Sequence, residues 1–328
     1  MVDMFRFATI GTNFIVDRFV KAATLVDSME FCAVYSRGTE SGRAFADKYG
    51  VGKVYTDLME LARDSDIDGV YIASPNSLHC EQAILMMEHG KHVLCEKPIA
   101  SNVQELDEMR KVARANGVIL LEAMKSVYGP GYAAVRDNLH KIGQVRNVNF
   151  NFSQYSSRYD KFREGVVENA FNPELSNGAL MDIGVYCVHV LLALFGSPDV
   201  VKSSGIFLSN GADAAGSLIC EYDSFLATVI YSKVANSNIP NEICGEFGTM
   251  VIDKLSDVGS VFIKYNDGRE ERVVFEKLPV MVYEIEKWLG LIDGSDLDED
   301  YNAVTCAQMV MLDDVRKQLG IVFPADRR

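Results

Sequence analysis

The sequence of 328 residues lacks the features that identify several classes of protein. Basic residues are few, since 32 Lys and Arg stand against 46 Asp and Glu, for a net charge of −14. Such a surface repels phosphate backbones and argues against nucleic acid and anionic membrane as partners, although a few local cations can still hold a small phosphate-bearing molecule. No run reaches the ~18 uninterrupted apolar residues of a membrane span. Residues 1–6 lack a basic segment leading into an apolar one, so we expect no signal peptide.

Paired cysteine motifs are also missing. The seven cysteines are scattered, and none stands in a Cys-x-x-Cys pattern. We therefore expect no disulfide framework and no zinc site, but reduced, mostly buried thiols in a cytoplasmic protein. The acidic stretch 293–298 is similar to a calcium loop, but Leu297 occupies a ligand position and the glycine spacing is wrong. We interpret it as a solvated loop, and we expect no bound metal.

What is present is enough apolar sequence for a sizeable core. Apolar residues make up 48% of the chain and charged residues 24%, which excludes a disordered protein. The length suits two domains of ordinary size.

The first part of the chain alternates short, continuous apolar runs with segments of helical period. Continuous apolar strands between helices are typical of a parallel sheet covered on both faces, and right-handed crossovers make it doubly wound. We predict an α/β, Rossmann-type NAD(P)-binding domain over residues 1–123. The expected strands are 5–10, 31–35, 69–73, 92–95 and 118–121, and the expected helices are 14–26, 39–49, 78–89 and 102–116.

After residue 123 the pattern changes to alternating strands joined by turn signals. We predict an α+β domain over 124–328, with a large, mostly antiparallel open sheet, for substrate binding and oligomerisation. The last helix is a candidate to pack back on the first domain. The expected strands are 144–153, 200–208, 216–222, 225–232, 241–247 and 259–265, and the expected helices are 179–195, 280–292 and 299–319.

The turn after the first strand stands where a Gly-x-Gly-x-x-Gly sequence would hold a pyrophosphate. Only its first glycine is present, while Asn13 and Val16 replace the other two. Asn tolerates the left-handed backbone that such a turn can require. Taken alone, the segment reads equally well as an ordinary strand–turn–helix. The candidate cofactor-binding residues here are Gly11, Thr12, Asn13, Phe14 and Ile15.

The end of the second strand indicates which cofactor is preferred. NAD-binding domains place Asp or Glu there for the ribose 2′-hydroxyl, but this chain has Tyr35, Ser36 and Arg37. An arginine beside a hydroxyl can hold a 2′-phosphate by charge-assisted hydrogen bonds. We therefore predict NADP(H) in preference to NAD(H), with a solvated Arg37 as the alternative.

Two motifs lie at the ends of successive parallel strands, where such sheets bind ligands. They are Ser74-Pro75-Asn76-x-x-His79 and Glu96-Lys97-Pro98. Their order after the eroded glycine turn, followed by Asp182-x-Gly184-x-Tyr186, resembles the Gfo/Idh/MocA family over essentially the whole chain. Residues 178–186 are similar to the branch that contains dimeric dihydrodiol dehydrogenase, NADP-linked D-xylose dehydrogenases and glucose–fructose oxidoreductase.

The resemblance implies roles for the residues of the first domain. Lys97 would be the catalytic lysine beside the nicotinamide, and Glu96 would orient the ribose or the lysine. Pro98 would fix the chain, with a cis Lys97–Pro98 bond as one way to do so. The nicotinamide side would be lined by Ser74, Pro75 and Asn76. His79 would stand behind them, and a capped helix start is the alternative for that residue.

On the helix 179–195, Asp182, Tyr186 and His189 are spaced i, i+4 and i+7 and so share one face. By resemblance, Tyr186 would position or protonate the substrate oxygen and Asp182 would bind a substrate hydroxyl. His189 is a further substrate-binding candidate, but we favour a supporting or core histidine. At Lys125 the similar dehydrogenases often carry an aromatic residue, so we hypothesise a substrate with an acidic or strongly polar group, or else a solvated lysine.

These residues predict an NADP-dependent oxidoreductase acting on the CH–OH group of a sugar, polyol or related hydroxy compound. Lys97 and Tyr186 would handle the proton. Two alternatives stay open: nicotinamide-assisted glycoside cleavage without net redox change, and a non-catalytic cofactor-binding regulator. We expect a small carbohydrate-like substrate, no nucleic-acid or membrane partner, and a homodimer or higher homo-oligomer.

Overall fold

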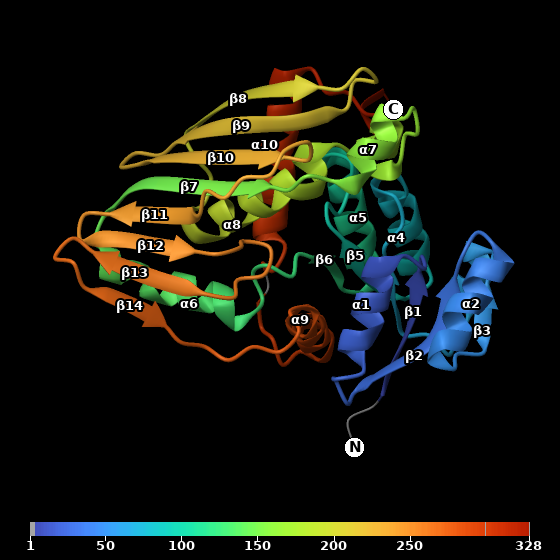
Figure 1. The fold of residues 1–328 in the computed structure, drawn as a ribbon. Coiled ribbons are helices and arrows are strands. Elements are labelled where there is room, and N and C mark those ends of the chain that lie inside the picture. The colour runs from blue at the N-terminus through green and yellow to red at the C-terminus, as the bar shows by residue number, and fades with distance from the viewer. Residues whose placement is uncertain (1–3, 299, 328) are drawn as a thin grey trace. The chain divides into compact units, whose positions relative to one another are not determined.

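The computed structural model describes residues 4–298 and 300–327, and the chain divides into two compact units (Figure 1). Unit 1 is Met1–Ala123 with Leu278–Asn302, and unit 2 is Met124–Lys277 with Ala303–Arg328. The first three residues, to which the signal-peptide expectation partly refers, and residue 299, the expected start of the last helix, lie outside the described residues.

Unit 1 contains the expected Rossmann-type sheet, with six parallel strands in the order β3-β2-β1-β4-β5-β6. The short edge strand β3 was not predicted. The left-handed glycines Gly50 and Gly117, with φ of +70° and +64°, end α2 and α5 as expected. The strands are β1 (Phe5–Ile10), β2 (Met29–Tyr35), β3 (Lys53–Tyr55), β4 (Gly69–Ile72), β5 (His92–Glu96) and β6 (Leu120–Ala123), and the helices are α1 (Phe14–Ala23), α2 (Thr39–Tyr49), α3 (Leu58–Arg63), α4 (His79–Glu88) and α5 (Val103–Asn116).

Aromatic rings fill the core beneath β1 and β4. Phe7 meets Phe19 edge-on at 5.6 Å between ring centroids, and Phe19 stacks on Tyr71. All three side chains are fully buried, and each contributes about 1.5–3 kcal/mol through the apolar area removed from water. Tyr71 also carries a hydroxyl to the strand end, where it contacts the site described below.

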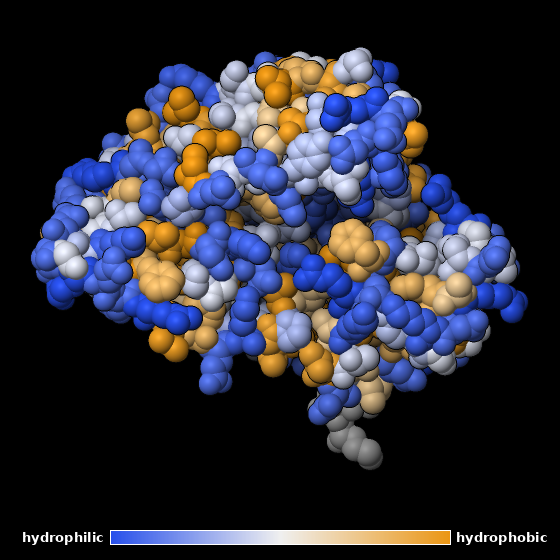
Figure 2. Space-filling model, viewed as in Figure 1, coloured by the Kyte–Doolittle hydropathy of each residue, from blue (hydrophilic) through white to orange (hydrophobic). Residues whose placement is uncertain are grey.

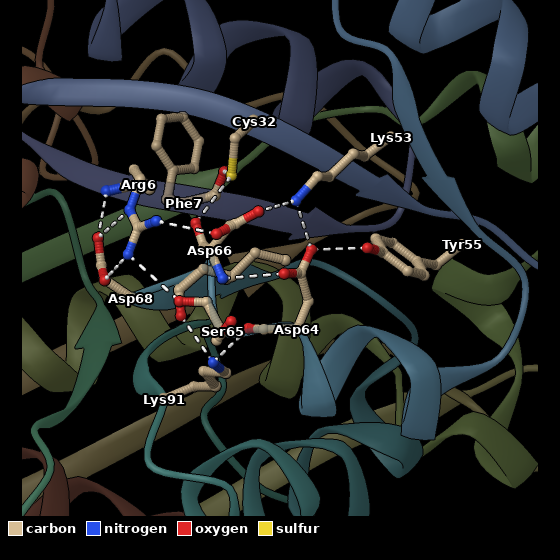
Figure 3. Close-up of polar contacts among 11 residues, drawn as sticks. Arg6, Phe7, Cys32, Lys53, Tyr55, Asp64, Ser65, Asp66, Asp68 and Lys91 are labelled. Carbon is tan, nitrogen blue, oxygen red and sulfur yellow. Dashed lines mark hydrogen bonds and ion pairs between the residues drawn. The ribbon is translucent and has the colours of Figure 1, made fainter.

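Charged residues secure the edge of this sheet at which the strands begin (Figure 3). The Arg6 guanidinium donates two hydrogen bonds to Asp68, at 2.8 and 3.1 Å. Lys53 donates to the Asp64 carboxylate at 2.8 Å, and the buried Lys91 ammonium donates to the Asp64 carbonyl oxygen at 2.6 Å. These contacts join the beginnings of β1, β3, β4 and β5, so they support the fold at the edge opposite to the strand ends.

The segment 278–302 differs from the expected domain assignment, because it belongs to unit 1. Its helix α9 (Met281–Asp293) packs on α1, and the buried Trp288 ring meets Phe5 edge-on at 5.0 Å. The last helix, α10 (Ala303–Leu319), packs on α8 (Val185–Phe195) and β8 (Val200–Phe207) of unit 2. The late segment that belongs to the first unit is therefore α9 with its flanks, while α10 belongs to unit 2.

Unit 2 is built on the predicted large, mostly antiparallel sheet, in the order β14-β13-β12-β11-β7-β10-β9-β8. Among the described strands of this sheet, only β7 and β10 pair in parallel. The alternation expected along β7 is present, since Val148 and Phe150 are buried while Asn147 and Asn149 are half-exposed. Besides β8, the strands are β7 (Val145–Ser153), β9 (Asp213–Glu221), β10 (Leu226–Ser232), β11 (Asn241–Gly245), β12 (Gly248–Ile252), β13 (Val261–Tyr265) and β14 (Glu270–Val273), with the further helices α6 (Pro130–Asn138) and α7 (Ser157–Arg163).

The helix predicted over 179–195 is not uniform. Leu180–Gly184 forms a π-helical turn, and only Val185–Phe195 is α-helical. The expected i, i+4 spacing on one regular helix is therefore wrong for Asp182, which lies in the π-turn; such turns are frequent at functional sites. By length and composition Pro173–Phe195 could cross a membrane, but 78% of its most apolar window is buried, as in a core helix.

Candidate active site

The glycine turn of unit 1 brings the backbone close to the end of β4. Gly11 has φ +117°, and a Cβ there would lie 3.0 Å from the Ala73 carbonyl oxygen, so a side chain would be strained. Thr12 and Ile15 are half-buried beside it, and Phe14 is 65% exposed.

Asn13 does not act as a left-handed substitute for glycine, since its φ is −79°. Its side-chain oxygen instead accepts from the N–H groups of Ile15 and Val16, at 3.0 and 3.3 Å, and so caps α1. Its Nδ2 donates to the Ala73 carbonyl oxygen at 2.9 Å. The expectation about its backbone was wrong, because the side chain stabilises the turn through hydrogen bonds.

The end of β2 presents hydroxyl groups and an exposed cation next to the start of α2. The Ser36 and Ser41 hydroxyls lie 2.8 Å apart, and the Arg37 side chain is exposed. The N-cap of α2, Gly38, makes no side-chain cap bond. A helix start with nearby hydroxyls and an arginine suits a phosphate group, so these residues fit a cofactor with a 2′-phosphate.

His79 joins the two motif loops of unit 1. Its ring is fully buried, with Nε2 3.0 Å from the Ser74 carbonyl oxygen and Nδ1 3.0 Å from that of Pro98. Burial lowers the pKa of His79 to about 4, so the ring is neutral at physiological pH. His79 begins α4 but does not cap it, and its contacts are those of a residue that holds the two loops.

The neighbouring residues of the first motif are also held. The Ser74 hydroxyl donates to the Gln82 side-chain oxygen at 2.7 Å, and Asn76 is 8% exposed. Pro75 is half-buried. The strand-end loop that is predicted to face the nicotinamide is therefore ordered by contacts within unit 1.

The loop that carries Lys97 is fixed by the carboxylate of Glu96. The Tyr71 hydroxyl donates to Glu96 Oε1 at 2.5 Å, and the Lys97 backbone N–H donates to Oε2 at 3.2 Å. The Lys97–Pro98 peptide bond is cis, as expected. Glu96 is buried and the Lys97 side chain is half-buried, so the lysine is partly withdrawn from water.

Two further carboxylates support this loop, and the sequence analysis did not identify either. Glu122 at the end of β6 accepts from the Ile99 N–H at 3.1 Å, and Glu105 accepts from the Ser101 N–H at 2.9 Å. Asn102 in turn caps α5 by accepting from the Glu105 N–H at 2.9 Å. The Asn-x-x-Glu spacing is that of a capping box and could have indicated Glu105; nothing local indicated Glu122.

In unit 2, Asp182 forms an ion pair with Lys233, which the sequence analysis did not single out. The Lys233 side chain is 4% exposed and that of Asp182 is 28% exposed. Tyr186 is 8% exposed and its ring lies 5.7 Å from that of Phe152. The Lys125 ammonium lies 5.8 Å from the Tyr186 ring centroid, so these two predicted substrate residues are neighbours in unit 2.

His189 is a buried histidine of unit 2. It is 2% exposed, and its Nδ1 lies 2.7 Å from the side-chain oxygen of Gln308 on α10. Burial lowers its pKa to about 4. This arrangement agrees with a supporting or core histidine, which we favoured over a substrate ligand.

Within residues 4–298 and 300–327, no group of three or more His, Cys, Asp or Glu side chains is arranged to hold a metal ion. The cysteines are free thiols. Burial raises the pKa of Cys220 to about 12, so that thiol stays protonated.

Comparisons with known proteins agree with the motifs. Residues 5–124 match the model of an oxidoreductase family with an NAD-binding Rossmann fold, and residues 134–251 match the Gfo/Idh/MocA C-terminal domain. The scyllo-inositol 2-dehydrogenase (NADP(+)) IolU of Bacillus subtilis (strain 168) is 49% identical over 99% of this chain and 100% of its own length. The trans-1,2-dihydrobenzene-1,2-diol dehydrogenase of Xenopus tropicalis is 29% identical over 89% of this chain and 90% of its own.

A solved structure of the 3-ketoreductase KijD10 from Actinomadura kijaniata, in complex with NADP and TDP-benzene, shares the fold. It superposes with a TM-score of 0.85 and 22% identity over 96% of this chain and 98% of that one. With both domain models matched in order and a relative of 49% identity along the whole chain, the protein belongs to the Gfo/Idh/MocA family of oxidoreductases, as its motifs predicted.

Proposed function

We propose that the protein is an NADP(H)-dependent dehydrogenase or reductase that transfers a hydride between nicotinamide and a CH–OH carbon of a polyol, sugar or related hydroxy compound. The observation that carries this proposal is the half-buried Lys97 on a loop held by Glu96, Tyr71 and His79, at the strand ends of a Rossmann sheet. The relative IolU, named an NADP(+)-dependent scyllo-inositol 2-dehydrogenase, supports a polyol as substrate.

The cofactor-binding residues fit NADP(H). Gly11 lets the backbone approach a pyrophosphate at the start of α1, and Ser36 with Arg37 would hold the 2′-phosphate. Ser74, Pro75 and Asn76 would line the nicotinamide side. When bound, the nicotinamide supplies the hydride acceptor or donor.

The remaining steps fall to side chains of this chain. A lysine partly removed from water can exchange a proton near neutral pH, so Lys97 would take the proton from the substrate hydroxyl during oxidation and return it during reduction. Asp182 would accept a hydrogen bond from a substrate hydroxyl. Tyr186 would donate to or position the reacting oxygen.

A screen of polyols, aldoses and sugar acids with NADP+ and NAD+, read by absorbance of the reduced ring, tests this function. We expect NADPH to form from NADP+ with a polyol or sugar, and NADH to form more slowly, or not at all, from NAD+. Sugar release without NADPH accumulation would identify glycoside cleavage instead. Cofactor binding without turnover across all substrate classes would indicate a regulator.

We also propose that the protein is a cytoplasmic homodimer that associates through the sheet of unit 2. One face of this sheet is covered by α8 and α10, while outward side chains such as Ile219 and Leu226 remain 47% and 49% exposed. The space-filling view shows apolar side chains among polar ones (Figure 2). Sedimentation of the wild type and of Ile219→Asp would test the interface. If the variant sediments with the same mass as the wild type, the interface is contradicted.

A further inference from the structure

Two charged side chains are buried together where β9 begins and β10 ends. Asp213 is 1% exposed and Lys233 is 3% exposed, and Asp and Lys side chains are almost never so buried unless they are paired. The Lys233 N–H donates to the Ala214 carbonyl oxygen at 2.9 Å, so the two segments are neighbours in the sheet. Neither residue has a role in the reaction described so far.

Asp213 supports the beginning of the helical segment that carries Asp182. Its Oδ2 accepts from the Leu180 backbone N–H at 2.6 Å, although the two residues are 33 positions apart. That helix start makes no side-chain cap bond of its own, so Asp213 supplies the missing acceptor at the positive end of the helix.

Gly178 is required by this arrangement. A Cβ at that position would lie 1.8 Å from Asp213 Oδ1, a distance that no side chain could accept without displacing the carboxylate. The chain before the helix and the carboxylate are therefore closely fitted to one another.

Lys233 contacts the side chain of Asp182, two residues after the Leu180 N–H that Asp213 binds. Its ammonium forms the ion pair with Asp182, lies 3.5 Å from the Ala170 carbonyl oxygen and stands 5.1 Å from the Phe171 ring centroid. The lysine is enclosed while Asp182 remains partly exposed. A buried cation beside a carboxylate favours its charged form, so Asp182 stays an acceptor and is held in one orientation.

We propose that Asp213 and Lys233 are positioning residues that hold Asp182 as an oriented, negatively charged acceptor for a neutral hydroxyl group of the substrate. The inference rests on the proposed function for the identity of the reaction. The proposal also specifies the substrate group that Asp182 binds. A hydroxyl group can donate a hydrogen bond to the Asp182 carboxylate, whereas a carboxylate or phosphate at the same position is repelled.

The charged and titratable groups that face Asp213 are Lys233 after β10, the phenol of Tyr231 on β10 and, through Lys233, Asp182 on the π-turn. Burial raises the pKa of Asp213 to about 6, although the Leu180 N–H and Lys233 act to lower it. Below that pH the carboxyl takes up a proton and loses its charge. We therefore expect the KM for a polyol to rise as the pH falls through about 6, and Asp213→Asn to weaken this dependence.

Lys233→Met tests the ion pair with little change of volume, and Lys233→Arg is the matched variant that keeps the charge. We expect Lys233→Met to raise the KM for a polyol about tenfold or more, with a smaller change in kcat and an unchanged Kd for NADPH. Lys233→Arg should restore most of the loss. An unchanged KM in Lys233→Met, or a loss that Lys233→Arg does not restore at all, would overturn the proposal.

A measurement without substrate separates this inference from the proposed function. In protein with ¹³C-labelled aspartate, we expect the titration of the Asp182 carboxylate, assigned with Asp182→Asn, to move to higher pH in Lys233→Met by about one unit or more. No movement would overturn the positioning role even if polyol oxidation is found. A movement in a protein that oxidises no polyol would support the positioning role while the proposed function fails.

Discussion

The Nδ1 atom of His79 lies 3.0 Å from the carbonyl oxygen of Pro98, so the first residue of α4 holds the loop that carries Lys97. Its other nitrogen lies at the same distance from the Ser74 carbonyl oxygen. A neutral imidazole has one N–H, so it donates to one of these carbonyl oxygens at a time. The ring therefore lies against both loops that follow β4 and β5, and its tautomer decides which loop receives the hydrogen bond.

Replacing His79 with Ala should affect both stability and catalysis. We expect the free energy of unfolding to fall by about 1–3 kcal/mol, because a buried carbonyl group loses its hydrogen-bond donor, and kcat to fall more than the KM for a polyol changes. Denaturant unfolding and steady-state kinetics measure the two effects. His89→Ala, at the end of the same helix, is the control and should leave kcat unchanged. A His79→Ala variant with wild-type kcat would show that the ring does not position Lys97.

Replacing Arg37 with Ala tests the preference for the phosphorylated cofactor. The Kd for NADPH should rise about tenfold or more, because a charge-assisted hydrogen bond to the 2′-phosphate is lost, while the Kd for NADH should change little. Fluorescence titration of both cofactors measures this difference, and Arg63→Ala on α3 serves as the control. Tighter binding of NADH than of NADPH by the wild type would contradict the assignment.

Lys125 bears on the nature of the substrate. Its ammonium lies near the Tyr186 ring in unit 2, so its charge is placed beside one predicted substrate residue. Lys125→Met should raise the KM for an acidic substrate and leave that for a neutral polyol nearly constant. If the KM is unchanged for every substrate that the enzyme accepts, the hypothesis of an acidic group fails.

The ion pairs at the edge where the strands of unit 1 begin, which include Lys53 and Asp64, predict how the stability of unit 1 responds to acid. Burial acts to raise the pKa of Asp64, but hydrogen bonds from Lys53 and Tyr55 outweigh it and lower the pKa to about 2. Since the folded-state pKa lies below the unfolded one, this stabilisation is complete above about pH 4 and is lost as the pH falls toward 2. Lys53→Met should cost no more than about 1 kcal/mol at neutral pH, because the lysine is 40% exposed and water screens its ion pairs, and it should flatten this acid dependence. Urea unfolding over a pH series measures both. Lys264→Met removes an exposed pair and should change neither quantity.

The sequence predicted the sheet of unit 1 well, because buried parallel strands are continuous apolar runs and their helices carry clear end signals such as Gly50 and Gly117. It did not predict β3, since a half-buried edge strand of three residues has too few apolar positions to form a pattern. Nor did it assign 278–302 to unit 1, because the contact between Trp288 and Phe5 joins positions far apart in the chain.

In the site, the motifs identified the residues at strand ends but not the side chains that hold them. The π-turn at Asp182 has no local sequence signal. Lys233, which pairs with Asp182, lies 51 residues further along the chain than Asp182, and Asp213, which accepts from the Leu180 N–H, lies 33 residues further along than Leu180. The sequence shows that Asn13 replaces a glycine of the phosphate-binding turn, but its hydrogen bonds to the start of α1 and to Ala73 depend on the fold. Local patterns report periodicity and turn chemistry, whereas these contacts form only when distant strands pair.

The central claim is that Lys97 moves the proton of an NADP-dependent oxidoreduction, and Lys97→Met tests it most directly. With the polyol or sugar that the screen identifies, the measurement is the rate of NADPH formation at saturating NADP+, together with the Kd for NADPH. We predict that the variant loses turnover by at least about a hundredfold while its Kd for NADPH stays within about threefold of the wild type. Turnover retained at the wild-type rate would contradict the account.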